Sequence, residues 1–413
     1  MANDLVQVGP DRVVDSRVLD IAPYDERARA ALGTAAPPPP LVARPDDHTR
    51  VGLLYLLGYS CEALQRNDEA AGGDRAGIPM TISTRTPSAL AAALRDIQAP
   101  VRADLEAVGQ ELWRIVSADV PLVQNVQGHL MGMKGKLFRP TLLLLSSSVD
   151  GESPRKAITF AAIIELIHLA TLVHDDAVDH SVLRRGMPTL NALFSHQVSV
   201  IMGDYLYLRA LRELVTIGDL EAMRAITFAS NEMTIGEIRQ LAQYDALSFS
   251  ENDYETLIRA KTAALFMAAC DVGAWCGAPD HRAALTRFGE RLGMAFQVAD
   301  DLLDYTEPTE MTGKPSGLDL KEHKVTLPLI AALREMPASA RARVDALFAA
   351  PEPDEEAIAE VVTIVRDHGG LEYARRRADQ YSREAEEALA DLPDGPSKSS
   401  LMDSIGYVVE RRW

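Results

Sequence analysis

The amino-acid sequence predicts an all-α protein, and three observations carry that prediction. From residue 87 onward apolar residues recur every three or four positions, as in LAAALRDIQAPVRADLEAVGQELWRIV, which is the period of an amphipathic helix. The period-two alternation of strands is hard to find. The helical stretches end at breakers such as Gly277-Ala278-Pro279. We therefore predict one large bundle of long helices packed around a centre.

Composition narrows the class of protein and the kind of partner. The 413 residues are 47% hydrophobic and 25% charged, as in ordinary globular proteins. A net charge of −18 argues against nucleic acid as a partner. It does not exclude a phosphate-bearing substrate, because local arginines and bound metal can reverse the sign within one cleft.

The cysteines and the apolar segments predict the compartment. Cys61, Cys270 and Cys276 are few and odd in number, so reduced thiols are expected rather than a disulfide framework. The first residues lack the basic-then-apolar pattern of a signal peptide. The apolar run at residues 51–60 is too short to span a bilayer. The sequence thus predicts a cytoplasmic protein.

The first 79 residues differ in composition from the rest of the chain. They contain PPPP at residues 37–40 and AAGGDRAGIP at residues 70–79, which rarely build a packed core. We predict that residues 1–79 are a disordered extension and that residues 80–413 form the folded domain. Met80 is a candidate for the true start of the protein.

A first cluster of carboxylates follows an apolar run in LIHLATLVHDDAVDHSVLRRGMPT, residues 166–189. On a helix Asp175, Asp176 and Asp179 lie within an arc of about 100°, and Asp175 and Asp179 repel each other at i,i+4. Mg²⁺ prefers one or two carboxylates with phosphate oxygens completing its shell. Arg184 and Arg185 suit those phosphate oxygens. The segment predicts a metal-and-diphosphate site, although a solvated acidic helix end has the same pattern.

The pattern recurs at residues 295–328. Asp300, Asp301 and Asp304 again lie in apolar helix, Gln297 is one turn earlier, and Lys314 and Lys324 follow. Two such clusters could clamp one metal–diphosphate group from opposite walls of a bundle.

A third basic element comes earlier, in MKGKLFRPTLLLL. Lys136 and Arg139 would add to the attraction of a helix start for anions. Taken alone, such a pair is more often a solvated helix start.

The order of these motifs resembles the trans-polyprenyl diphosphate synthase family, and most closely its long-chain members such as octaprenyl diphosphate synthases. GKLFRP, ELIHLATLVHDDAVDHSVLRRGMPT, MGDYLYLRA, KTAALF, FQVADDLLDY and GKPSGLDLKEHKVTLP occur in the family's order over roughly residues 85–413. The resemblance implies an isoprenoid-synthase-type bundle around a central cavity. Residues 80–413 would then be the catalytic domain.

The resemblance also implies roles for individual residues. Those expected to bind isopentenyl diphosphate are Lys136, Arg139, His168 and Arg185. Those expected to bind the allylic diphosphate are Arg184, Lys261, Thr262, Gln297 and Lys314. Two or three Mg²⁺ ions would be held by the two clusters, namely Asp175, Asp176, Asp179, Asp300, Asp301 and Asp304. The residues expected to be catalytic are Asp175, Asp179, Lys261, Asp300 and Asp304.

The implied reaction is a Mg²⁺-dependent, head-to-tail addition of isopentenyl diphosphate to an allylic diphosphate such as farnesyl diphosphate. In the family, the residues four and five positions before the first aspartate help to form the floor of the product tunnel. Here they are Thr171 and Ala170, both small, so a long product of about C30 to C50 should fit. Small residues there could instead serve close helix packing. The family further implies a homodimer. A long product would suit quinone side-chain synthesis, and its release could involve a peripheral contact with a membrane.

Departures from the family pattern are small. Lys134 replaces the first glycine of Gly-Gly-Lys, Phe138 replaces a common leucine, Ala177 replaces a larger aliphatic residue, and His323 stands where glycine is common. A terpene cyclase would lack the second DDxxD and the isopentenyl diphosphate residues. A regulatory subunit would have degraded aspartates. Glu165 and His168 also form the E-x-x-H of di-iron bundles, but no second such pair follows.

Overall fold

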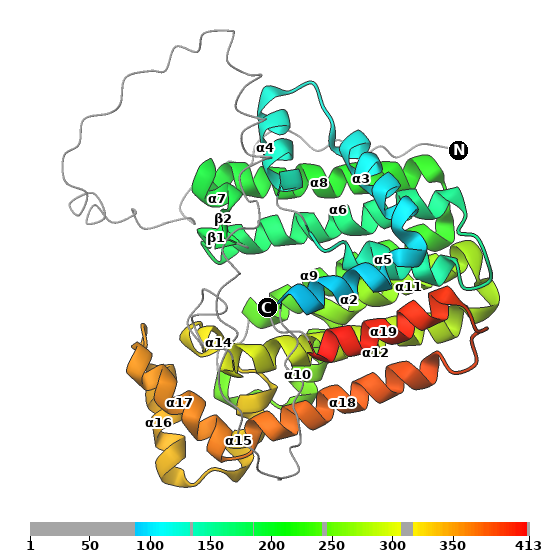
Figure 1. The fold of residues 1–413 in the computed structure, drawn as a ribbon. Coiled ribbons are helices and arrows are strands. Elements are labelled where there is room, and N and C mark those ends of the chain that lie inside the picture. Colours follow the sequence, from blue (N-terminus) through cyan, green and yellow to red (C-terminus); the bar gives the residue numbers. More distant parts are fainter. Residues whose placement is uncertain (1–86, 133–134, 185, 242–245, 307–316, 411–413) are drawn as a thin grey trace, which may run out of the picture. The chain divides into compact units, whose positions relative to one another are not determined.

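The computed structural model describes residues 87–132, 135–184, 186–241, 246–306 and 317–410. The predicted extension over residues 1–79 and the candidate start at Met80 lie outside this part. Across the described ranges the chain forms long helices joined by short turns, so the all-α prediction is confirmed (Figure 1). The strands found there are β1 (Leu183–Arg184) and β2 (Met187–Pro188), an antiparallel pair of two residues each.

The helices follow one another along the chain with few long connections. The first half contains α2 (Pro87–Ile97), η2 (Ala99–Val101), α3 (Arg102–Val116), α4 (Pro121–Gly132), α5 (Phe138–Ser147), α6 (Arg155–Val178), α7 (Leu190–Leu193), α8 (His196–Ile217) and α9 (Leu220–Leu241). The second half contains η3 (Ala246–Ser248), α10 (Glu251–Ile258), η4 (Arg259–Ala263), α11 (Ala264–Gly277), η5 (Pro279–His281), α12 (Arg282–Thr306), α14 (Leu318–Lys321), α15 (Leu327–Glu335), α16 (Ala338–Ala349), α17 (Glu355–Asp367), α18 (Gly370–Ala388) and α19 (Pro396–Glu410).

Helix α6 lies inside the bundle and ends at the first aspartate cluster. It packs against α3, α5, α8 and α11, and every residue from Ala161 to Ile167 is buried. By length and composition alone α6 could cross a membrane, but 61% of its most apolar stretch is buried inside the protein. An apolar surface on nearly all sides is what such a surrounded helix needs.

Helix α12 carries the second cluster and packs tightly on its neighbours. A Cβ at Gly293 would lie 2.6 Å from the Cα of Ala263, and a Cβ at Gly289 would lie 2.7 Å from the carbonyl oxygen of Phe266. Glycine is therefore required where α12 crosses η4 and α11, because any side chain there would displace backbone.

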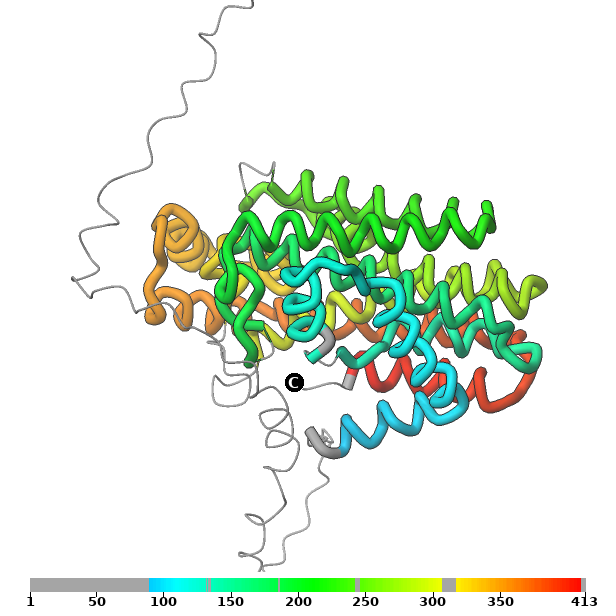
Figure 2. Tube along the Cα trace, turned by 90° about the horizontal axis from the view of Figure 1, so that it is seen from above, coloured from blue at the N-terminus to red at the C-terminus, as the bar shows by residue number. Residues whose placement is uncertain are grey.

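Two further pairs of helices lie on opposite sides of this bundle. Seen from above, the green α8 and α9 run along one side, and the blue α2 and red α19 lie on the other (Figure 2). Helices α2 and α19 contact each other, and α19 also contacts α5 and α12. The helix α19, near the end of the chain, thus packs against α5.

Candidate active site

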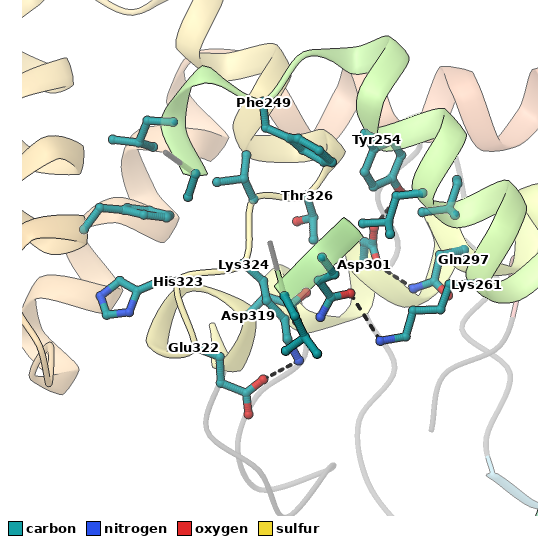
Figure 3. Close-up of a pocket in the computed structure, with 18 of the residues that line it drawn as sticks. Phe249, Tyr254, Lys261, Gln297, Asp301, Asp319, Glu322, His323, Lys324 and Thr326 are labelled. Carbon is teal, nitrogen blue, oxygen red and sulfur yellow. Dashed lines mark hydrogen bonds and ion pairs between the residues drawn. The ribbon is translucent and has the colours of Figure 1, made fainter. Parts of the chain in front are cut away.

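A cavity of about 930 Å³ lies where the end of α6, the segment η4, helix α10 and the end of α12 meet. Its polar lining comes from elements far apart in the sequence (Figure 3). The charged and hydrogen-bonding residues that line it include Asp179, Gln240, Tyr254, Lys261, Thr262, Gln297, Asp301, Asp319, Glu322, Lys324 and Thr326. Members of both predicted aspartate clusters therefore face one cavity.

Asp175 occupies the last turn of α6, with Asp179 as the residue that caps the helix. Burial raises the pKa of Asp175 to about 6, although Lys261 and Arg184 act to lower it, while the charges of Glu237 and Asp179 raise it further. Asp175 thus lies in a field where additional positive charge would favour its ionised form.

Asp176 and Arg184 are paired with each other. Asp176 is buried, and the Nε of Arg184 donates to both of its carboxylate oxygens at 2.9 Å. The β1–β2 hairpin turns the chain back after α6 and so brings Arg184 onto the helix end. The predicted metal-supporting carboxylate is thus bonded to the arginine that we expected to bind the allylic substrate.

Lys261 and Thr262 belong to η4, a π-helical segment between α10 and α11. Such segments carry an extra residue per turn and frequently mark functional sites. The Nζ of Lys261 lies 2.6 Å from Oε2 of Glu237 and donates to Oε1 of Gln240 at 3.2 Å. The lysine is therefore held at the cavity wall by two residues of α9.

A chain of hydrogen bonds joins η4, α12 and α10. The hydroxyl of Thr262 donates to Oε1 of Gln297 at 2.6 Å, and Nε2 of Gln297 donates to Oδ1 of Asp301 at 2.8 Å. The hydroxyl of Tyr254 donates to Oδ2 of Asp301 at 2.5 Å. Figure 3 shows Tyr254 and Gln297 around Asp301. Burial, reinforced by the charge of Asp319, raises the pKa of Asp301 well above its ordinary value.

The carboxylate of Asp304 binds the start of α14. Its two oxygens accept hydrogen bonds from the backbone N–H groups of Leu318 and Asp319, at 3.0 and 3.1 Å. Burial and the nearby charge of Asp304 raise the pKa of Asp319 to about 7. Asp300 is half-buried beside them, and its charge also raises the pKa of Asp319.

Asp319 and Tyr254 are among the residues of the site that were not singled out from the sequence. Asp319 stands inside the motif GKPSGLDLKEHKVTLP, which could have drawn attention to it. Tyr254 carries no such signal. It is 47 positions from Asp301 in the sequence, and only folding brings the two side chains together.

The residues expected to bind isopentenyl diphosphate lie elsewhere. Lys136 is exposed just before α5, Arg139 is half-buried in its first turn, and His168 is half-buried in α6. None of the three is among the described residues that line the cavity. Arg185 and Lys314 lie outside the part of the chain that the structure describes.

The donor set of the two clusters fits a hard divalent cation that shares its shell with substrate oxygens. The predicted ligands are all carboxylates, which suits Mg²⁺ or Ca²⁺. In the described residues, no group of three or more His, Cys, Asp and Glu side chains is close enough to hold a metal unaided. Any cation bound here would need further oxygen ligands, such as those of a diphosphate.

Comparison with known proteins decides the family. The pattern of the polyprenyl synthetase family matches residues 120–365. This chain belongs to the polyprenyl synthetase family. As a polyprenyl synthetase it is an enzyme of the prenyltransferase class, as the sequence predicted.

Polyprenyl synthetases of known activity match most of the chain. It is 37% identical to an all-trans-nonaprenyl-diphosphate synthase (geranyl-diphosphate specific) of Rhodobacter capsulatus, over 77% of this chain and 98% of that protein. It is 35% identical to the octaprenyl diphosphate synthase of Escherichia coli, over 75% of this chain and 96% of that protein.

Solved polyprenyl synthetase structures share the fold. A decaprenyl diphosphate synthase from Rhodobacter capsulatus superposes with a TM-score of 0.73 at 35% identity, covering 77% of this chain and 98% of that one. A polyprenyl synthase from Caulobacter crescentus, complexed with calcium and isoprenyl diphosphate, also gives 0.73, at 32% identity over 78% and 98% of the two chains. The predicted isoprenoid-synthase-type fold is thereby confirmed.

Proposed function

We propose that this polyprenyl synthetase is a long-chain trans-polyprenyl diphosphate synthase that adds isopentenyl diphosphate units to an allylic diphosphate. The observation that carries the proposal is that Asp179 of the first cluster and Asp301 of the second line one cavity, together with Lys261. Carboxylates for metal and a lysine for phosphate are the groups that a departing diphosphate requires. The octaprenyl and nonaprenyl synthases among its relatives support this proposal.

The metal of the proposed reaction is Mg²⁺, two or three ions per site. The carboxylates that would hold it are Asp175, Asp179, Asp300 and Asp304, with Asp176 and Asp301 in support. Bound there, the cations would neutralise charge that develops on the departing diphosphate. The calcium in the Caulobacter crescentus structure supports a divalent-cation site in the family.

The protein's own side chains position the allylic substrate. Lys261 is held by α9, and Thr262 is fixed through Gln297, so both present defined hydrogen-bonding groups to a diphosphate. Apolar side chains of the cavity, such as Leu247, Phe249 and Val325, reduce access of water. Excluding water protects an allylic cation from being quenched to an alcohol.

The length of the product depends on α6 in this proposal. Ala170 is buried and Thr171 is half-buried, one turn below Asp175 on the same helix. The hydroxyl of Thr171 donates to the carbonyl oxygen of His168 at 2.8 Å, so it is satisfied within the helix. Small side chains at these two positions leave space for a chain of about C30 to C50.

A homodimer is part of the proposal, and α8 with α9 supports it. Ile201, Leu208 and Val215 recur every seven residues on α8 and are each at least 60% exposed. Leu220 and Phe228 are similarly exposed on α9, the neighbouring helix. Apolar stripes of this kind mark association surfaces. Two relatives are named heptaprenyl diphosphate synthase component 2, so association with a different subunit is the alternative.

The cellular location that we propose is based on the expected product rather than on the fold. We propose that the enzyme works in the cytoplasm and touches the membrane surface when it releases a long polyprenyl diphosphate for quinone side-chain synthesis. Fractionation of the native cells, followed by immunoblotting of soluble and membrane fractions, tests this location.

The experiment that tests the function is one incubation of the purified protein. Labelled isopentenyl diphosphate, Mg²⁺ and either farnesyl or geranyl diphosphate are supplied, and the dephosphorylated products are separated by chain length. We expect all-trans products of about C30 to C50. A cyclic hydrocarbon product would identify a terpene cyclase, and no elongation with either primer would contradict the proposal. Light scattering of the same sample measures whether two copies associate.

A further inference from the structure

Four aromatic side chains from four helices form a continuous row beside the start of α5. Tyr407 of α19, Phe138 of α5, Phe266 of α11 and Phe296 of α12 follow one another with ring centroids 5.5, 6.0 and 5.1 Å apart. The first three are buried and Phe296 is half-buried. Rings at these separations attract each other by edge-to-face and offset contacts, so each holds the next in place.

Two cations rest on this row. The Nζ of Lys136 lies 5.7 Å from the ring centroid of Tyr407, and the Cζ of Arg139 lies 4.6 Å from that of Phe266. Phe138 stands between the two supporting rings and is the neighbour of Arg139 in sequence. Leu137 has a φ of 49°, an uncommon left-handed conformation that turns the backbone between Lys136 and Phe138.

An aromatic face suits a cation that must bind an anion. A lysine or arginine side chain loses entropy when it is fixed in one position. The face of a ring attracts the cation through its quadrupole and does not neutralise its charge. The row therefore supports two positive groups, Lys136 and Arg139, through their contacts with ring faces.

The far end of the row reaches the other half of the site. Phe296 directly precedes Gln297, which accepts from Thr262 and donates to Asp301. A continuous set of packed rings thus connects Lys136 and Arg139 with the residues proposed to bind the allylic substrate.

We infer that this aromatic row sets the position of Lys136 and Arg139 for the diphosphate of isopentenyl diphosphate, with Tyr407 and Phe138 as positioning residues. The inference rests on the proposed function, and it adds a part of the site that lies on the last helix, 271 positions from Lys136 along the chain. Phe138, which departs from the family's common leucine, closes the gap between the rings of Tyr407 and Phe266.

Replacement of Tyr407 gives the sharpest test. In Tyr407→Leu the KM and the calorimetric Kd for isopentenyl diphosphate should rise about three- to tenfold, the range of one cation–π contact. The kcat and the KM for farnesyl diphosphate should change less than about twofold, because the hydrogen bonds of Lys261 and Gln297 are untouched. Tyr407→Phe keeps the ring, so its KM and Kd for isopentenyl diphosphate should equal those of the wild type. Phe138→Leu should have a smaller effect in the same direction.

Two controls separate positioning from loss of packing. Phe288→Leu removes a fully buried ring from α12 and should lower thermal stability without changing the Kd for isopentenyl diphosphate. In a Lys136→Ala background, Tyr407→Leu should change that Kd much less than in the wild type, because the contact it removes is already gone.

The outcomes are distinct. An unchanged Kd in Tyr407→Leu, or an equal rise in Tyr407→Phe, overturns the positioning role while the elongation assay still supports the function. Absence of elongation by the wild type overturns the proposed function and, with it, this inference, whatever the variants do.

Discussion

Arg184 donates from Nε to both carboxylate oxygens of Asp176, each at 2.9 Å. This contact joins the β1–β2 hairpin to the end of α6 and compensates a carboxylate that is almost fully buried. A buried carboxylate without a charged donor is costly, so the pair stabilises the acidic end of the helix as well as shaping it.

Arg184→Gln should therefore lower the free energy of unfolding by about 1–3 kcal/mol, because Asp176 loses a charged donor. The double variant with Asp176→Asn should regain part of this loss, since a neutral amide costs less to bury. Urea unfolding of the wild type, the two single variants and the double variant measures the coupling. Additive losses in the double variant would show that the contact contributes nothing.

Asp175→Asn should stabilise the metal-free protein at high pH and abolish elongation. The pKa of Asp175 is about 6 in the fold, against an ordinary value of 3.8. The folded state therefore binds more protons between these values, and the stability of the wild type falls as pH rises from about 4 to about 6. At pH 8 the variant should melt about 2–4 °C higher than the wild type.

As the pH falls below the ordinary value of 3.8, the difference between the two melting temperatures should vanish, because the wild-type carboxyl then becomes protonated in both states. Added Mg²⁺ with inorganic pyrophosphate should raise the melting temperature of the wild type at pH 8 and have less effect on the variant. Equal melting temperatures of the metal-free proteins at pH 8 would contradict the raised pKa.

Tyr254→Phe removes the hydroxyl that donates to Asp301 at 2.5 Å and leaves the ring. Because Tyr254 is buried, the loss should cost about 1–3 kcal/mol of unfolding free energy. The KM for the allylic diphosphate should also rise. Without the tyrosine hydroxyl the carboxylate of Asp301 would be held less firmly, and Gln297 depends on its hydrogen bond to that carboxylate. Steady-state kinetics beside urea unfolding measures both effects, and a variant equal to wild type in both would remove Tyr254 from the site.

Thr171→Phe should shorten the product, because a ring one turn below Asp175 occupies the path of the growing chain. Thr171→Ser is the matched control, since it keeps a small side chain and the hydrogen bond to the carbonyl of His168. Chain-length separation of the products is the measurement. Identical product distributions in Thr171→Phe and wild type would mean that the small residue serves helix packing.

The local features of the site could be predicted from the sequence. Asp175 and Asp179 are four residues apart at the end of a strongly apolar helix, and α6 indeed ends between them. The relation between the clusters could be inferred only from chemistry and from the family, because nothing local connects Asp179 with Asp301.

Other parts of the site depend on contacts that no sequence pattern reveals. The pairing of Asp176 with Arg184 depends on the β1–β2 hairpin. Its strands are only two residues long, too short to produce the alternation of apolar and polar residues that predicts a strand. The sequence around Lys261 has the pattern of a continuous α-helix and gives no sign of the π-helical segment found there. Asp304 accepts from the backbone of α14 and thereby holds a turn whose amides give no signal of their own.

The glycines of α12 limit how the product specificity of this enzyme could be engineered. At Gly289 and Gly293 even one methyl group would meet backbone of η4 or α11 at 2.6–2.7 Å. Random libraries at these two positions should yield mostly misfolded proteins. A search for variants with new chain lengths is better directed to α6, where Ala170 and Thr171 stand one turn before the first aspartate cluster.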